Sequence, residues 1–172
     1  LGVNEVEFKK LYREEVRTDI EIAMTRGVAI CGKIDGEVAV FLCGCDVMDI
    51  SISDIKKAYC EPFEPYERVM NSLYTLIKQS SKRGTDFYIQ YIVKKPGVKD
   101  FLLPIRIIKL LAKLLEIKGY KSSYTIPIAK SALELQSNWN AQVISSINLS
   151  NLTFGEARPF EKLDFDLKIL KF

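Results

Sequence analysis

Apolar residues recur at intervals of three and four over residues 5–25, and this spacing predicts an amphipathic helix. The residues that fall near its apolar face are Val6, Leu11, Val16, Ile20 and Ala23. Asn4 stands where an N-cap residue is expected, and Gly27 follows where a helix typically ends. The first predicted element of the chain is therefore a long helix with one face against a core.

Two apolar runs follow within residues 27–46, and the dipeptide Asp35-Gly36 separates them. An Asp-Gly pair between apolar runs is a strong signal for a two-residue β-hairpin turn, because both residues tolerate a positive φ. The turn would set Ile34 opposite Glu37 and Ile30 opposite Phe41. Both strands are apolar on both faces, so we expect the hairpin to lie inside a sheet that is covered on both sides.

From residue 66 onward the pattern alternates between helical and extended segments. The helical segments are 66–83, ended by Gly84, then 104–118, and a short one at 130–139. The extended segments are 86–95, 122–129, 141–149 and a final one within 158–172. Segment 104–118 carries one solvated stripe on an otherwise buried helix. The residues of this stripe are Arg106, Lys109, Lys113 and Glu116.

Segments 86–95, 104–118 and 122–129 together show the strand, helix, strand pattern of a βαβ unit. Such a unit places its two strands parallel and joins them by a right-handed crossover. A lone parallel pair among antiparallel strands can splay, which leaves a slot beside the N-terminus of the crossover helix, where unpaired N–H groups point. We therefore expect the two strands to be adjacent and parallel and to diverge at their C-terminal ends.

The 172 residues suffice for one domain with a real core, and a content of 48% hydrophobic and 27% charged residues is typical of a globular chain. The formal net charge of +3 is mild and the lysines are scattered, so no nucleic-acid partner is expected. No apolar run approaches the roughly 20 residues of a membrane span, so no membrane partner is expected either. The chain begins at Leu1 without a signal-like segment, and we expect a cytoplasmic protein that is a fragment or a processed chain.

The chain has no His and four Cys, which excludes Ser-His-Asp and Cys-His catalysis and His-ligated metals. Cys43 and Cys45 have CxC spacing, Cys31 lies in the preceding strand, and Cys60 is remote. A zinc site built from Cys alone normally shows two CxxC pairs, which this sequence lacks. We expect the three hairpin thiols to be buried, reduced and metal-free.

The order helix, hairpin, helix, strand, long helix, strand, short helix, strand, strand resembles the GNAT superfamily of acetyl-CoA-dependent N-acetyltransferases. The segment LGVNEVEFKKLYREEVRTDIEIAMTRGVAICGKIDGEVAVFLCGCD is similar to the arylalkylamine N-acetyltransferase-like branch, and so is the tail ISSINLSNLTFGEARPFEKL. The resemblance implies a single α/β domain over residues 1–172, a three-layer α-β-α sandwich with a mixed, mostly antiparallel sheet and one parallel βαβ step. It also implies that the first strand and helix of the family, and the amine-activating carboxylate, have no counterpart here.

The resemblance further implies acetyl transfer from acetyl-CoA to a small-molecule primary amine by direct attack, in a monomer or homodimer. The strand whose backbone would pair with the pantetheine arm contains Tyr91, Ile92 and Val93. The family's pyrophosphate loop, Arg/Gln-x-x-Gly-x-Gly/Ala, falls on Lys99, Asp100, Phe101, Leu102, Leu103 and Pro104. Ser131 would contact the cofactor arm, and Ser137 is the candidate to protonate the departing thiolate.

This loop departs from the family pattern. Leu102 replaces the first Gly and Pro104 the final small residue, which restricts backbone approach and removes one N–H donor. Asp100 adds a negative charge where two phosphates would lie, whereas Lys99 can supply a positive one. Two functions therefore stay open: an N-acetyltransferase, or a non-catalytic GNAT-fold binding domain that has lost the cofactor loop.

Overall fold

The computed structural model describes residues 5–50, 64–100, 102–128 and 141–172. The chain divides into two compact units. We call Tyr12–Ile50 together with Ser81–Tyr124 the crossover unit, and Leu1–Leu11, Ser51–Ser80 and Thr125–Phe172 the closing unit. None of the described helices is both long and apolar enough to cross a lipid bilayer.

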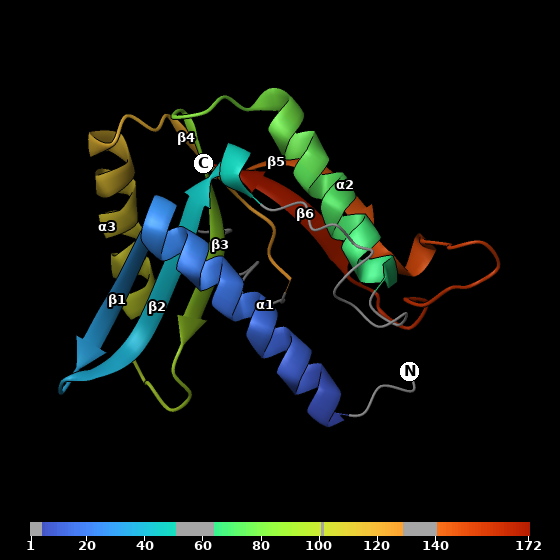
Figure 1. Cartoon of the computed structure of the whole chain (residues 1–172), viewed down its shortest axis with the longest axis horizontal. Helices are drawn as coiled ribbons and strands as arrows, with labels where there is room; N and C mark the ends of the chain where they lie inside the picture. The colour runs from blue at the N-terminus through green and yellow to red at the C-terminus, as the bar shows by residue number, and fades with distance from the viewer. Residues whose placement is uncertain (1–4, 51–63, 101, 129–140) are drawn as a thin grey trace. The chain divides into compact units, whose positions relative to one another are not determined.

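Helix α1 (Glu5–Arg26) confirms the helix expected at the start of the chain (Figure 1). It ends at Gly27, whose backbone N–H donates a hydrogen bond of 3.0 Å to the carbonyl of Ala23. A side chain at this position would not fit, because a Cβ on Gly27 would lie 2.1 Å from the carbonyl oxygen of Gly44. Glycine here therefore lets the end of α1 approach the backbone of the sheet closely.

Strands β1 (Val28–Ile34) and β2 (Glu37–Asp46) form the predicted hairpin. Its turn residues, Asp35 and Gly36, have φ of 51° and 81°. The expected pair of Ile34 and Glu37 is confirmed, but Ile30 pairs with Leu42, so the predicted pair of Ile30 with Phe41 is wrong. An irregularity between Gly32 and Lys33 adds one residue to β2 and shifts the register beyond it.

The two hairpin strands differ in burial. Strand β2 is buried along most of its length, whereas β1 lies at the edge of the strand order and only its Val28 is buried. The expectation that both strands would be covered on both sides is therefore right for β2 and wrong for β1. For the same reason Cys31 is exposed rather than buried, while Cys43 and Cys45 are buried as predicted.

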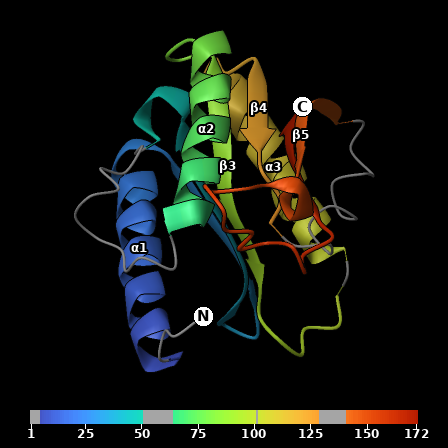
Figure 2. The same ribbon diagram turned by 90° about the vertical axis from the view of Figure 1, so that its right-hand side faces the viewer.

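Strand β3 (Asp86–Lys94), helix α3 (Leu103–Ile117) and strand β4 (Ser122–Thr125) form the predicted βαβ unit. β3 pairs antiparallel with β2 on one side and parallel with β4 on the other. Figure 2 shows α1 and α3 on opposite faces of the strands of the crossover unit. The mixed α/β sandwich with one parallel step is thereby confirmed.

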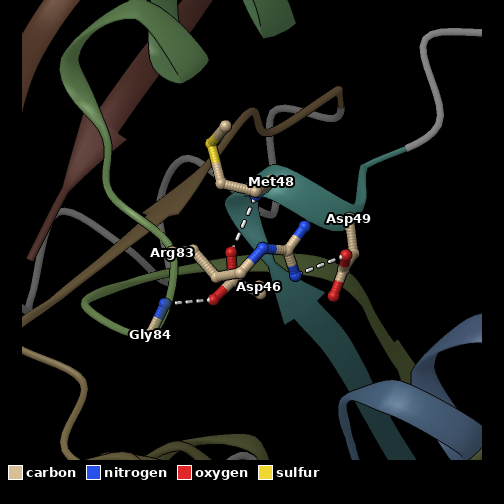
Figure 3. Close-up of polar contacts among 5 residues, drawn as sticks. All are labelled: Asp46, Met48, Asp49, Arg83 and Gly84. Carbon is tan, nitrogen blue, oxygen red and sulfur yellow. Dashed lines mark hydrogen bonds and ion pairs between the residues drawn. The ribbon is translucent and has the colours of Figure 1, made fainter.

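A polar latch holds the start of β3 against the end of β2 (Figure 3). Asp46, which is 4% exposed, accepts backbone hydrogen bonds from Gly84 at 2.6 Å and from Met48 at 2.8 Å. Met48 belongs to the short 3₁₀ helix η1 (Val47–Asp49). Arg83 and Asp49 add an ion pair of 2.8 Å. The latch thus fixes the beginning of β3, whereas the other end of the strand leads into the loop before α3.

The closing unit contains helix α2 (Glu64–Ser80) and the antiparallel strands β5 (Gln142–Asn148) and β6 (Asp166–Lys171), with the 3₁₀ helix η3 (Leu149–Asn151) after β5. α2 ends before the expected Gly84, and the Ser80 hydroxyl donates to the Ile77 carbonyl at 3.1 Å in its last turn. Gly84 instead has a φ of 77° in the turn before β3. The short helix predicted at 130–139 lies outside the described residues.

Candidate active site

Strand β3 extends well beyond its parallel partner. The ladder with β4 covers three pairs, from Asp86 with Ser122 to Tyr88 with Tyr124. On its other side, the ladder with β2 continues as far as Lys94. β3 and β4 therefore pair only at their beginnings. Beyond Tyr88, β3 continues toward the loop before α3 and, among the described strands, pairs only with β2.

A β-bulge lies in this extension. Ile89 pairs with Gly44 and Tyr91 with Cys43, so Gln90 is an extra residue of β3. A bulge re-aims the side chains around it, so neighbouring residues can reach the same side of a sheet. The side chains of Gln90 and Tyr91 both contact Asp19 of α1. The Tyr91 hydroxyl donates a hydrogen bond of 2.7 Å to Asp19 Oδ2, and Gln90 also forms a side-chain hydrogen bond with Asp19.

The Asp19 carboxylate is partly buried and accepts hydrogen bonds from polar side chains, but no described cation is paired with it. Burial raises the pKa of the Asp19 carboxyl above its usual range, and the hydrogen bonds from Tyr91 and Gln90 act in the opposite direction. No lysine or arginine forms an ion pair with Asp19 among the residues that the structure describes. Gln90 Oε1 is also buried and accepts no hydrogen bond from that part of the chain. Within the described residues, the group thus holds a carboxylate without a paired cation and an amide oxygen without a donor.

Asp19 was not among the site residues predicted from the sequence. A signal was present in the helical periodicity. Asp19 lies three residues after Val16, one before Ile20 and four before Ala23, which places an acidic residue within the apolar face of α1. Acidic residues on a buried helix face are uncommon unless they are paired or functional.

In the loop before α3, the side chain of Asp100 bonds one backbone N–H directly before the helix begins. Asp100 Oδ1 accepts a hydrogen bond of 2.8 Å from the backbone N–H of Leu102, and its Oδ2 lies 3.7 Å from a guanidinium nitrogen of Arg106. Pro104, in the first turn, has no N–H to donate. The Asp100 carboxylate thus lies just before the N-terminus of α3, where the helix dipole favours a negative charge.

The structure describes most of the predicted cofactor residues. Tyr91, Ile92 and Val93 lie on the extension of β3, and the exposed side chains of Lys99 and Leu102 follow in the loop. Leu103 begins α3, and the next residue of the helix, Pro104, is buried. The remaining predicted residues, Phe101, Ser131 and Ser137, lie outside the described residues.

The buried thiols of Cys43 and Cys45 are expected to be unreactive at neutral pH. Burial, reinforced by the charge of Asp19, raises the pKa of Cys43 to about 12. Burial also raises the pKa of Cys45 to about 12, with a further contribution from the charge of Asp49. A thiol with such a pKa holds almost no thiolate at neutral pH. In the described ranges, no group of three or more Cys, Asp or Glu residues is arranged to hold a metal ion.

No protein-family model and no curated protein sequence matches this chain. Solved structures do match it. The C-terminal condensation domain of Ebony, in complex with beta-alanyl-dopamine, superposes with a TM-score of 0.79 at 6% identity over 95% of this chain and 80% of that one. Arylalkylamine N-acetyltransferase 2 from Aedes aegypti gives 0.78 at 14% identity over 92% and 79%.

A third match is a GNAT family acetyltransferase from Elizabethkingia anophelis with acetyl-CoA bound, at a TM-score of 0.52 and 10% identity over 89% of this chain and 80% of that one. At these identities the likeness concerns the fold. Together with the parallel βαβ step and the short β3–β4 ladder, it confirms the resemblance found in the sequence. The chain has the fold of the GNAT superfamily, and arylalkylamine N-acetyltransferases are among its structural neighbours.

Proposed function

We propose that this chain transfers an acetyl group from acetyl-CoA to a small primary amine. The observation that carries the proposal is the early end of the β3–β4 ladder at Tyr88 and Tyr124, while β3 continues to Lys94. A strand edge from which the neighbour has withdrawn can pair with the amide groups of an extended ligand. The pantetheine arm of acetyl-CoA is such a ligand, and it presents a thioester, which is an activated acyl group.

The residues available to acetyl-CoA fit it in part. The backbone of Tyr91, Ile92 and Val93 would hold the pantetheine arm, and the exposed Lys99 would attract the diphosphate. The N-terminus of α3 follows directly, with the positive end of its dipole. This part of the chain supplies binding and orientation, which bring an amine and a thioester into reacting distance.

The pyrophosphate position fits less well. The Leu102 N–H is already bonded to Asp100, and Pro104 contributes no N–H. A diphosphate would have to displace the Asp100 carboxylate or meet its negative charge. We therefore expect the diphosphate to contribute little to the affinity for acetyl-CoA, and the strand edge to contribute most of it.

The same observation favours the second candidate function, a non-catalytic GNAT-fold binding domain. In that case the Asp100 carboxylate, held by the Leu102 N–H and by Arg106, permanently replaces the phosphate that a cofactor would supply. Such a domain would retain the fold without turnover. Small-molecule amines would then be ligands and not acceptors.

Calorimetry of the purified chain with two acetyl thioesters separates these functions. Acetyl-CoA carries the diphosphate, and S-acetyl-pantetheine lacks it but keeps the arm that would pair with β3. The acetyltransferase proposal expects both to bind, with acetyl-CoA at most about tenfold tighter, and expects release of the free thiol when 2-phenylethylamine is added. Binding of neither thioester would overturn the proposal and support the non-catalytic domain.

A further inference from the structure

The side chains of Asp19, Gln90 and Tyr91 form a group that has no part in the proposed binding of acetyl-CoA, which uses only the backbone of Tyr91. Its members come from two different elements of the crossover unit, α1 and the bulge of β3. The Tyr91 hydroxyl fixes the Asp19 carboxylate through a hydrogen bond of 2.7 Å. Asp19, Gln90 and Tyr91 are each partly exposed, so the group is partly withdrawn from water and still open to a ligand.

The chemistry of this group calls for a cation that also donates hydrogen bonds. A carboxylate withdrawn from water is costly unless a positive charge balances it. No lysine or arginine does so among the described residues, and the buried Gln90 Oε1 lacks a donor there as well. A primary ammonium group carries one positive charge and three N–H donors, so it would satisfy both acceptors at once.

The position of the group suits an acyl acceptor. Tyr91 lies three residues beyond Tyr88, where the parallel ladder with β4 ends. The backbone of the same residue belongs to the strand edge that we assign to the pantetheine arm. An amine held by Asp19 would therefore lie on the α1 side of the strand, next to the thioester. Bulges are frequent beside active sites because they re-aim side chains in this way.

We infer that Asp19 and Gln90 bind the ammonium group of a primary-amine acceptor, and that Asp19 takes its proton. This inference rests on the proposed acetyltransferase function for its chemical step. The ammonium ion passes one proton to the Asp19 carboxylate, and the nitrogen lone pair then forms a bond to the thioester carbonyl carbon. The C–S bond breaks, and the thiolate receives the second proton that the new amide nitrogen loses. Tyr91 is a positioning residue, since it touches Asp19.

The raised pKa of Asp19 agrees with this role, because a carboxyl whose pKa lies closer to neutrality accepts a proton from an amine more readily. Glu21, two residues further along α1, lies on another side of the helix, and its carboxylate pairs with Arg17 at 2.9 Å. Cys43, which faces Asp19 from β2, stays protonated because burial raises its pKa to about 12.

The test measures binding of 2-phenylethylamine and 1,4-diaminobutane to the whole chain, with and without coenzyme A. The control ligand 2-phenylethanol has the same ring and no charge. We expect the amines to bind the wild type and Asp19→Asn to weaken them at least tenfold, with no change for 2-phenylethanol or acetyl-CoA. Glu21→Gln removes an exposed acid of the same helix and should leave all affinities unchanged.

Two results separate this inference from the proposed function. If acetyl-CoA does not bind but the amines bind in an Asp19-dependent way, the acetyltransferase proposal fails and the amine site stands. If acetyl-CoA binds but Asp19→Asn keeps the amine affinity of the wild type, or if neither amine binds the wild type, the assignment of Asp19 is overturned. Tyr91→Phe should weaken amine binding less than Asp19→Asn does, because it removes only the positioning contact.

Discussion

The carboxylate of Asp46 joins the end of β2 to the turn before β3, because its Oδ2 accepts a hydrogen bond of 2.6 Å from the backbone N–H of Gly84. Its Oδ1 accepts another from Met48 at 2.8 Å (Figure 3). In Asp46→Asn an amide NH₂ group would face one of these N–H donors and leave it unsatisfied. We expect the free energy of unfolding, measured with urea, to fall by about 1–3 kcal/mol.

The matched control is Asp49→Asn, three residues along the chain. Asp49 pairs with Arg83, whose side chain is 64% exposed, so its ion pair contributes little to stability. The loss in Asp49→Asn should therefore be smaller than in Asp46→Asn. Equal losses in the two variants would show that the latch acts through overall charge and not through the hydrogen bonds of Asp46.

Thiol reactivity should divide the hairpin cysteines into two classes. Cys31 is exposed on the edge strand β1, whereas burial raises the pKa of Cys43 and of Cys45 to about 12. With iodoacetamide at pH 8, we expect Cys31 to be alkylated in the folded chain and the other two to react only after unfolding. Peptide mass spectrometry measures each site separately. Rapid modification of Cys43 in the folded chain would contradict the burial described here.

The fold was largely predictable because long periodic patterns and one turn dipeptide determine most of it. The errors arose where a single residue changes the register. The irregularity between Gly32 and Lys33 moved the partner of Ile30 by one position, and no feature of an evenly apolar strand indicates where such a residue will fall. Exposure of β1 was also missed, since edge and central strands with the same composition differ only in their tertiary neighbours.

The candidate site was predictable only in its backbone part. The βαβ pattern located the strand edge and the start of α3, because both follow from local periodicity. The bulge at Gln90 was not predictable, and the contact of Tyr91 with Asp19 joins residues 72 positions apart. The effect of Asp100 was only half predicted: its charge was evident, whereas its bonds to Leu102 and Arg106 depend on the folded loop.

Asp19→Asn should change stability in a pH-dependent way. Burial raises the pKa of Asp19 in the folded chain, so the folded state keeps this proton to a higher pH than the unfolded state does. The contribution of Asp19 to the free energy of unfolding is fully present below the unfolded pKa of about 3.9 and is lost as the pH rises through the higher folded pKa. Asparagine does not titrate, so the variant should gain stability relative to the wild type between pH 4 and pH 7.

Urea unfolding of both chains at these two pH values measures the difference. Asparagine can still accept the Tyr91 hydrogen bond, and a rotated Gln90 amide can accept from its NH₂ group. A variant that gains stability but loses amine affinity would fit a carboxylate kept for function at a cost in stability. A variant that is equally destabilised at both pH values would instead mark Asp19 as a purely structural residue.

The loop before α3 allows the last prediction. Asp100→Gly together with Leu102→Gly removes the carboxylate that holds the Leu102 N–H and lets the backbone approach a diphosphate. Arg106 also loses its partner at 3.7 Å and becomes available to a phosphate. We expect acetyl-CoA to bind more tightly by about 1–3 kcal/mol in this double variant, the range of a recovered charge-assisted hydrogen bond.

Three comparisons give this prediction its specificity. S-acetyl-pantetheine, which has no diphosphate, should bind the double variant and the wild type equally. Asp164→Gly removes an exposed acid elsewhere in the chain and should leave acetyl-CoA binding unchanged, which separates a local effect from one of net charge. Lys99→Ala should weaken acetyl-CoA, and more strongly at low salt, because salt screens the attraction of an exposed lysine. If acetyl-CoA binds tightly and equally to the wild type, the double variant and Lys99→Ala, the diphosphate does not use residues 99–104, and the loop is no part of the donor site.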